Sequence, residues 1–195
     1  MKTYIINDLT KLDDTMTTVL MQSTPSLGIL ENNIRCVFRR PNDDRVNLEL
    51  CNELEIPVIP ISSTKGAVIS NINDIAAMVW IPGYNVVSWG AYIFNRLAHY
   101  LTGQHLKMTL VNNDILLYGK KIGGYSEEIT ARGVVGVLFI AMEDAQELVN
   151  QICLKHTDKK TAGLHNYGIT NTEIKDLIIR ETEVYLTLLS IEGGK

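Results

Sequence analysis

Asn113 and Asp114 stand side by side near the middle of the sequence, where they place an amide next to a carboxylate. Oxygen atoms of these two kinds suit a metal ion or a polar ligand. A lysine pair follows at Lys120–Lys121 and adds two compact positive charges. Gly123–Gly124 then removes two side chains, which would let a ligand come close to the backbone. These residue types in this order could form a site for a polar or charged ligand.

The segment Val111–Gly124 that carries these residues has the pattern of a β-hairpin. It predicts a strand, a tight turn at Tyr118–Lys120 and a second strand that begins with lysine and reaches the two glycines. A hairpin with a basic turn is also a common structural element that needs no ligand. The hairpin alone leaves both interpretations open.

The composition is that of an ordinary globular protein. The chain has 195 residues, 46% of them hydrophobic, and a formal net charge of −4, which argues against nucleic acid as a partner. It has no apolar run long enough to span a membrane and no signal-peptide pattern at its N-terminus. Three widely spaced cysteines match neither a disulfide framework nor a zinc site. We expect one domain over residues 1–195, cytoplasmic and reduced, with no nucleic-acid or membrane partner.

The pattern of elements predicts the fold class. About ten short strands and four or five helices are unevenly interspersed, which indicates an α+β domain with mixed, mostly antiparallel β-sheets. A long helix is expected over residues 89–102 with Ser88 as its cap, and another begins at the capping box Thr170–Glu173. Asn47 is expected to cap a short helix over residues 48–54. Strict strand–helix alternation is missing, so a doubly wound parallel sheet is not expected.

Four segments, taken in order, resemble the lipoate–protein ligases and their relatives, the biotin–protein ligases and octanoyltransferases. Val46–Val58 resembles the helix and strand that lead into the lipoyl-binding loop, and Ser62–Val68 stands in the place of that loop. The hairpin follows with Asn-Asp, a turn and Gly-Lys-Lys-Ile, and Lys159–Thr170 resembles the segment that closes the catalytic domain. The resemblance extends over most of the chain. It implies a catalytic domain of the biotin/lipoate ligase type without the C-terminal accessory domain of larger ligases.

The resemblance implies an ATP-dependent enzyme. Such an enzyme activates lipoate, octanoate or a related acid to an acyl-adenylate and transfers the acyl group to a lysine of a lipoyl-acceptor protein domain. By position, Lys121 is similar to the essential lysine, which would stabilise charge on the α-phosphate and the acyl carbonyl. Asn113 resembles a nucleotide contact, Asp114 a ligand of Mg²⁺, and Gly123–Gly124 the residues beside the adenylate. ATP and Mg²⁺ are the implied cofactors, and a separate accessory protein is a further implied partner.

The lipoyl-binding loop departs from the family pattern, which has two arginines, three glycines and a His-Asp pair. The corresponding positions are Pro60–Ile61, Thr64–Gly66 and Ser70–Asn71. Lys65, Gly66 and Ala67 are the residues of this loop that the resemblance assigns to ligand binding. Lys65 adds a positive charge near the missing arginines, but a lysine does not reproduce the bidentate fork of arginine. An altered pocket is therefore expected.

Two other functions remain open. Octanoyltransferases of this fold use a cysteine nucleophile, and Cys153 falls close to that position, where a thiolate could form an acyl-thioester without ATP. Cys153 also continues the apolar stripe of a predicted helix, which indicates core packing instead. The altered loop supports a third hypothesis, a non-catalytic member of the fold that binds a nucleotide, a small acid or a protein partner.

Overall fold

A computed structural model describes residues 1–6, 12–60, 67–84, 88–154 and 160–192. The described residues form ten β-strands and five α-helices. The α+β fold class and the mostly antiparallel sheets predicted from the sequence are confirmed. In the part of the chain that is described, none of the helices combines enough length and apolar character to cross a membrane.

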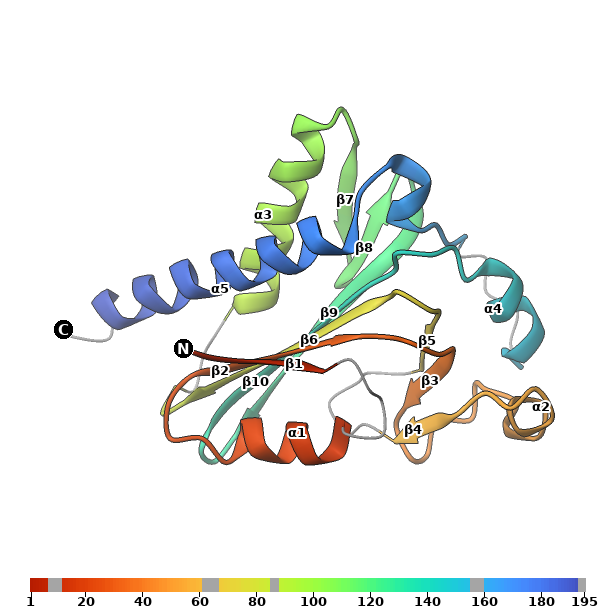
Figure 1. The fold of residues 1–195 in the computed structure, drawn as a ribbon, viewed down its shortest axis with the longest axis horizontal. Helices are drawn as coiled ribbons and strands as arrows, with labels where there is room; N and C mark the ends of the chain where they lie inside the picture. The colour runs from red at the N-terminus through yellow and green to blue at the C-terminus, as the bar shows by residue number, and fades with distance from the viewer. Residues whose placement is uncertain (7–11, 61–66, 85–87, 155–159, 193–195) are drawn as a thin grey trace.

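Seven strands form the large sheet that runs through the centre of the molecule (Figure 1). They are β1 (Lys2–Ile6), β2 (Ser26–Glu31), β6 (Ile75–Pro82), β7 (Met108–Val111), β8 (Asp114–Leu117), β9 (Lys120–Thr130) and β10 (Gly133–Ile140). Their order across the sheet is β1-β2-β6-β10-β9-β8-β7. Only the β1–β2 pair of this sheet is parallel, and every other neighbouring pair is antiparallel. Sequence neighbours therefore pair directly from β7 to β10, which brings the predicted hairpin to one side of the sheet.

The small sheet contains three strands and lies beyond one end of the large sheet (Figure 1). Its strands are β3 (Cys36–Arg39), β4 (Val58–Pro60) and β5 (Val68–Ser70), in the order β4-β3-β5. Two short helices, α2 (Leu48–Glu53) and α4 (Gln146–Ile152), share a small apolar cluster with it. Asn47 caps α2 as predicted, because its side chain accepts a hydrogen bond from Leu50 N at 3.1 Å.

Each face of the large sheet is covered by helices, and strand β6 shows why. Its residues alternate, so that Ile75, Ala77, Val79 and Ile81 join the main core while Met78 and Trp80 join a second cluster. Helix α1 (Leu12–Leu20) covers the second cluster through Val19. Helices α3 (Trp89–Gly103) and α5 (Asn171–Glu192) cover the main core on the other face (Figure 1).

The start of helix α3 differs from the prediction. Ser88 occupies the N-cap position as predicted, but its side chain makes no capping hydrogen bond. Glu127 of strand β9 caps the first turn instead: its Oε1 accepts a hydrogen bond from Gly90 N at 2.8 Å. The strand can come this close because residue 90 is glycine: a Cβ there would lie 2.2 Å from the ring of Tyr125. The cap is a tertiary contact, which local sequence rules do not detect.

Helix α5 begins as the sequence predicted. Thr170 N donates to Glu173 Oε2 at 2.7 Å, and Glu173 N donates to Thr170 Oγ1 at 3.3 Å, which is the reciprocal geometry of a capping box. Further along α5, Thr182 accepts a 3.0 Å hydrogen bond from the indole N–H of the fully buried Trp89. This bond satisfies the polar atom of the largest buried side chain and ties α5 to α3.

Candidate functional site

Two tight turns, rather than one, shape the segment expected to be a single hairpin. The first joins β7 to β8 at Asn112 and Asn113, whose φ angles are 50° and 68°. The second joins β8 to β9 at Tyr118 and Gly119, whose φ angles are 48° and 78°. Two successive positive φ angles are typical of the type I′ turns that close two-residue hairpins, and asparagine and glycine tolerate this conformation best. The second turn was predicted from the sequence, and the first was not.

The first turn and the register of β8 with β9 bring Asp114 and Lys121 together. Lys121 pairs with Leu116, which lies two residues beyond Asp114 on the same face of β8. A register shift between Ile115 and Leu116 accompanies this pairing. The Lys121 ammonium lies 2.7 Å from Asp114 Oδ1, with 35% of the lysine side chain and 17% of the aspartate side chain exposed. Two residues that the sequence predicted to belong to the candidate site therefore form one partly buried ion pair.

Lys120 occupies the opposite face of β9. It pairs with Leu117, begins the strand directly after the turn and is exposed. Since side chains alternate along a strand, the two adjacent lysines point in opposite directions. Lys121 is the one that reaches Asp114.

Close contacts within the chain explain why two positions of β9 are glycines. A Cβ at Gly123 would lie 2.1 Å from the carbonyl oxygen of Phe139 in the neighbouring strand. A Cβ at Gly124 would lie 3.0 Å from the carbonyl oxygen of Asn113 and 3.6 Å from Asp114 Oδ1. Gly123 therefore permits close contact between strands, and Gly124 leaves room for the turn that presents Asp114.

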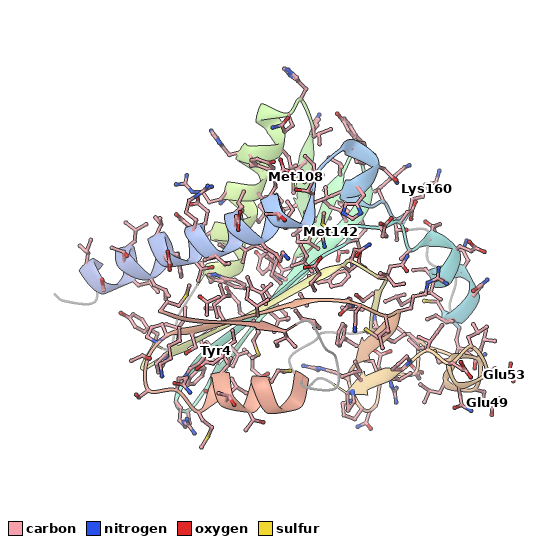
Figure 2. All side chains as sticks on the ribbon, viewed as in Figure 1. Tyr4, Glu49, Glu53, Met108, Met142 and Lys160 are labelled. Carbon is pink, nitrogen blue, oxygen red and sulfur yellow. The ribbon has the colours of Figure 1, made fainter. Side chains whose placement is uncertain are left out.

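A segment far along the chain lies against Lys121. We call residues Lys160–Tyr167 the strap. Lys121 N donates to Lys160 O at 2.7 Å, and Ala162 N donates to Lys121 O at 3.0 Å, so the strap extends the sheet beside the candidate lysine. Lys160 itself is exposed at the edge of the molecule (Figure 2). No local pattern in residues 160–167 predicts this contact.

A polar network begins where the strap crosses the end of β10. His165 lies between two side chains: its Nδ1 is 2.7 Å from Glu143 Oε1, and its Nε2 is 2.6 Å from Asn171 Oδ1. Asn171 Nδ2 donates in turn to Glu31 Oε1 at 2.8 Å and to the Asn73 carbonyl at 2.6 Å. These five residues come from five separate segments of the chain. Sequence reasoning had no signal for any of them as a group.

Three structural comparisons bear on this arrangement. A Thermoplasma acidophilum protein, Ta0514, solved with bound lipoic acid, aligns with a TM-score of 0.77 at 14% identity over 95% of this chain and 86% of that one. A bi-partite lipoate protein ligase from the same organism, solved in a study that includes its E2 lipoyl domain, aligns at 0.76 and 12% identity over 95% and 83% of the two chains. Lipoate-protein ligase A bound with ATP aligns at 0.76 and 15% identity over 96% and 86%.

The chain has the lipoate–protein ligase fold. No protein-family model matches the sequence, and no curated protein matches it either. At such low identity, the similarity was visible in the sequence only in the order of short segments, whereas the fold shows it over 95% of the chain.

Within the lipoate-ligase fold, the predicted loop residues divide into two groups. Lys65 and Gly66 lie outside the described residues. Ala67 is partly buried and packs against the cluster shared by the small sheet, α2 and α4. The assignment of these residues to ligand binding stays a prediction.

The donor set around Asp114 bears on the implied Mg²⁺. Among the described residues, no three His, Cys, Asp or Glu side chains gather closely enough to hold a metal ion by themselves. Mg²⁺ in nucleotide sites commonly takes one or two carboxylates and completes its shell with phosphate oxygens and water. Asp114 supplies one such carboxylate, so the residues present fit Mg²⁺ that arrives with a nucleotide. Lys121 is its partner in the structure and would have to share it.

Cys153 does not have the surroundings of an activated nucleophile. It caps the C-terminal end of α4, forms a bridge with Val46 and is partly buried. Burial raises the pKa of the Cys153 thiol, the Arg45 charge lowers it and the Asp43 charge raises it, with a net upward shift. A raised pKa disfavours the thiolate that acyl transfer requires. These surroundings favour the packing interpretation.

Asp74 was not singled out from the sequence, yet it is fully buried at the start of β6. Its Oδ1 accepts from Met142 N at 2.7 Å and Glu143 N at 3.2 Å, and its Oδ2 accepts from Asn71 N at 2.6 Å. Burial raises the pKa of Asp74 to about 7 from its ordinary 3.8, even though these backbone N–H groups favour the charged form. The carboxyl group thus joins the end of β10 to the loop before β6.

The titration of Asp74 predicts how stability depends on pH. Folding favours its protonated form, so its contribution to the free energy of unfolding is complete below the unfolded pKa and is lost as pH rises through about 7. The loss is on the order of 4 kcal/mol over the whole interval. Asp74→Asn should reduce this slope by the part that Asp74 contributes, because residue 74 of the variant does not titrate, while the part contributed by His165 remains. Urea unfolding at intervals from pH 4.5 to pH 8 measures it.

Asp176→Asn is the matched control, because Asp176 is exposed on α5 and should leave the slope unchanged. The comparison concerns the slope and not the absolute stability, since Asp74→Asn also replaces an acceptor of the Asn71 N–H bond with an N–H donor. A slope that is unchanged in Asp74→Asn would show that Asp74 is already ionised throughout this range.

Proposed function

We propose that this chain is the catalytic-type domain of a lipoate–protein ligase-like enzyme. It would activate lipoate, octanoate or a related acid with ATP and pass the acyl group to a lysine of an acceptor protein. The observation that carries the proposal is the Lys121–Asp114 pair, 2.7 Å apart, at the hairpin of a lipoate-ligase fold. The ATP-bound state of one structural relative supports the choice of nucleotide.

Lys121 would act where negative charge develops. In acyl-adenylate formation, a carboxylate oxygen of the acid bonds to the α-phosphorus of ATP, and the bond from that phosphorus to the pyrophosphate oxygen breaks. A fixed ammonium group near the α-phosphate stabilises the charge of this transition state more than that of the ground state. The partly buried position of Lys121 strengthens the effect, because few waters screen the charge. Its backbone hydrogen bonds to the strap fix the Lys121 backbone, from which the side chain extends.

Asp114 would hold Mg²⁺ on the phosphates. The ion supplies charge neutralisation on the pyrophosphate that leaves. Without the nucleotide, the same carboxylate pairs with Lys121 and orients its ammonium group. When the nucleotide binds, its phosphates offer Lys121 a new partner, so the pair can separate without leaving either charge unmatched. Asn113 and Gly124 shape the turn beside them, and we assign them to the nucleotide side of the pocket.

The partners follow from the same proposal. One structural relative was solved in work on a bi-partite ligase and its E2 lipoyl domain. By analogy, we propose a lipoyl-acceptor domain as the protein substrate of this chain and a separate accessory protein as a further partner. The small carboxylic acid is the first substrate, and the bound lipoic acid of another relative supports lipoate as the first to test.

Isotope exchange between labelled pyrophosphate and ATP tests the proposal directly. Exchange should require Mg²⁺ and one acid from a panel of lipoate, octanoate, hexanoate and biotin, because exchange reports reversible adenylate formation. A parallel reaction without acid is the control. Tight binding of ATP or acid in calorimetry, with no exchange for any acid and with a candidate accessory protein supplied, would instead identify a non-catalytic binding protein.

A further inference from the structure

Both ring nitrogens of His165 face oxygen acceptors. Nδ1 lies 2.7 Å from a carboxylate oxygen of Glu143, which accepts only. Nε2 lies 2.6 Å from the side-chain oxygen of Asn171. The orientation of that amide follows from its other contacts, because its nitrogen donates to Glu31 Oε1 at 2.8 Å and to the Asn73 carbonyl at 2.6 Å. Rotating the amide would set its oxygen against two other acceptors, so the oxygen faces His165.

Two facing acceptors select the imidazolium. A neutral imidazole has one N–H and one lone pair, so one of its two nitrogens would face an oxygen with no hydrogen between them. The acidic groups around the ring also favour the imidazolium. Glu143 follows β10, Asp74 precedes β6, and Glu31 at the end of β2 is itself paired with Lys175 of α5. Burial lowers the pKa of His165, but the bonds to Glu143 and Asn171 and the nearby carboxylates raise it, for a net upward shift.

The strap connects His165 to the backbone of Lys121. His165 N donates to Met142 O at 2.9 Å, and Leu164 N donates to Ala141 O at 3.2 Å. Between them and Lys121, Gly163 packs directly on the backbone, since a Cβ there would lie 2.4 Å from the carbonyl carbon of Glu143. Three residues before His165, Ala162 N donates to Lys121 O at 3.0 Å. A short, closely packed segment therefore joins the histidine ring to the backbone of the candidate lysine.

We propose that the His165 imidazolium is a pH-dependent clasp that holds the strap on the sheet and so positions Lys121. The clasp joins the end of β10, the strap and the first residue of α5 through one ring. Its effect on catalysis rests on the function proposed for Lys121, whereas its effect on the strap does not. His165 touches neither Lys121 nor Asp114 and is a positioning residue.

The clasp should weaken as pH rises. His165 binds its proton more tightly in the folded than in the unfolded chain. Its contribution to the free energy of unfolding is therefore complete below the unfolded pKa near 6.5 and is lost as pH rises through the higher folded pKa. About 29% of the His165 side chain and 38% of the Glu143 side chain are exposed. The proton can therefore leave without unfolding of the chain.

Nitrogen NMR of the intact chain with ¹⁵N-labelled histidine tests the clasp without any assay of activity. At pH 6.5, both ring nitrogens of His165 should carry protons, and the midpoint of its titration should lie above the ordinary histidine value of 6.5. Glu143→Gln keeps an acceptor oxygen but removes the charge, so the midpoint should move to lower pH. A neutral His165 tautomer at pH 6.5, or a midpoint unmoved by Glu143→Gln, would overturn the proposal.

Amide hydrogen exchange then tests the link to Lys121. The protection factor of the Ala162 amide should fall roughly tenfold or more as pH rises through the His165 midpoint. The neutral ring loses one of its two hydrogen bonds, to Glu143 or to Asn171, and the strap is then held less tightly. In Glu143→Gln this fall should shift together with the midpoint. His165→Gln should remove the pH step, and His99→Gln should keep it. Protection of Ala162 that does not follow the midpoint in wild type and in Glu143→Gln would refute the link, even if His165→Gln fails to fold.

The activity measurement separates this inference from the proposed function. Where the wild-type chain supports acid-dependent pyrophosphate exchange, kcat should fall through the same pH range, and the range should shift in Glu143→Gln while KM for ATP changes less. A kcat profile identical in wild type and Glu143→Gln would remove the catalytic part of the clasp. Absence of exchange under every condition would reject the proposed function, and the NMR and hydrogen-exchange results would still decide whether the clasp exists.

Discussion

Lys121→Ala is expected to lower kcat/KM for acid-dependent pyrophosphate exchange by roughly 10²–10³-fold or more, the usual effect of removing one group that stabilises transition-state charge. The lysine is the charged partner of Asp114, and its side chain is about one-third exposed. Its removal should therefore change the folding stability little while it removes the positive charge from the proposed α-phosphate site. Exchange kinetics with saturating Mg²⁺, together with thermal unfolding, measure both quantities.

Lys120→Ala is the matched control for that experiment. Lys120 is the adjacent residue, has the same charge and is exposed on the opposite face of β9. It should retain exchange within a few-fold of wild type. Equal losses in the two variants would show that the hairpin's overall positive charge matters rather than Lys121. Full activity in Lys121→Ala would remove the lysine from the mechanism.

Gly123→Ala should destabilise the chain by about 3 kcal/mol, at the upper end of the usual range for overpacking. The new Cβ would lie 2.1 Å from the Phe139 carbonyl oxygen, and a backbone atom inside a sheet cannot yield as a flexible side chain would. Strands β9 and β10 would have to separate at the residue two positions from Lys121. For a chain of this size, the thermal midpoint should fall by about 10 °C.

Gly103→Ala provides the contrast. Gly103 is the last residue of α3, and nothing lies within 4 Å of its added Cβ. Alanine should therefore stabilise the helix slightly, by up to about 1 kcal/mol. Thermal unfolding of the two variants isolates the effect of the close strand contact. Equal stability of Gly123→Ala and Gly103→Ala would show that β9 and β10 can separate at no cost.

Much of the fold followed from local rules that act within a few residues. The capping box at Thr170–Glu173 and the cap at Asn47 formed as predicted, since each depends on side chains within three positions of the backbone groups they satisfy. The turn at Tyr118–Gly119 was also predicted, because glycine tolerates the positive φ angle it needs. The α+β class followed from the number and uneven order of the elements.

Other local predictions failed where a distant residue supplied the contact. Ser88 is a favourable capping residue, but Glu127 bonds the first turn of α3 from another strand. The turn at Asn112–Asn113 was missed because Asn112 was assigned to the first strand and Asn113 to ligand binding, although two consecutive asparagines also suit a type I′ turn. Asp114, whose side chain pairs with Lys121, directly follows this turn.

The sequence by itself determined the residue types of the candidate site, the turn beside the lysines and the order of segments that resembles the lipoate ligases. Only the tertiary structure decided that Asp114 reaches Lys121, that the strap bonds its backbone and that His165 lies between two acceptors. The reason is physical. The local patterns concern hydrogen bonds and packing within a turn or a strand, whereas these contacts require strand register and the close approach of segments that are far apart in the sequence, such as Lys121 and the strap.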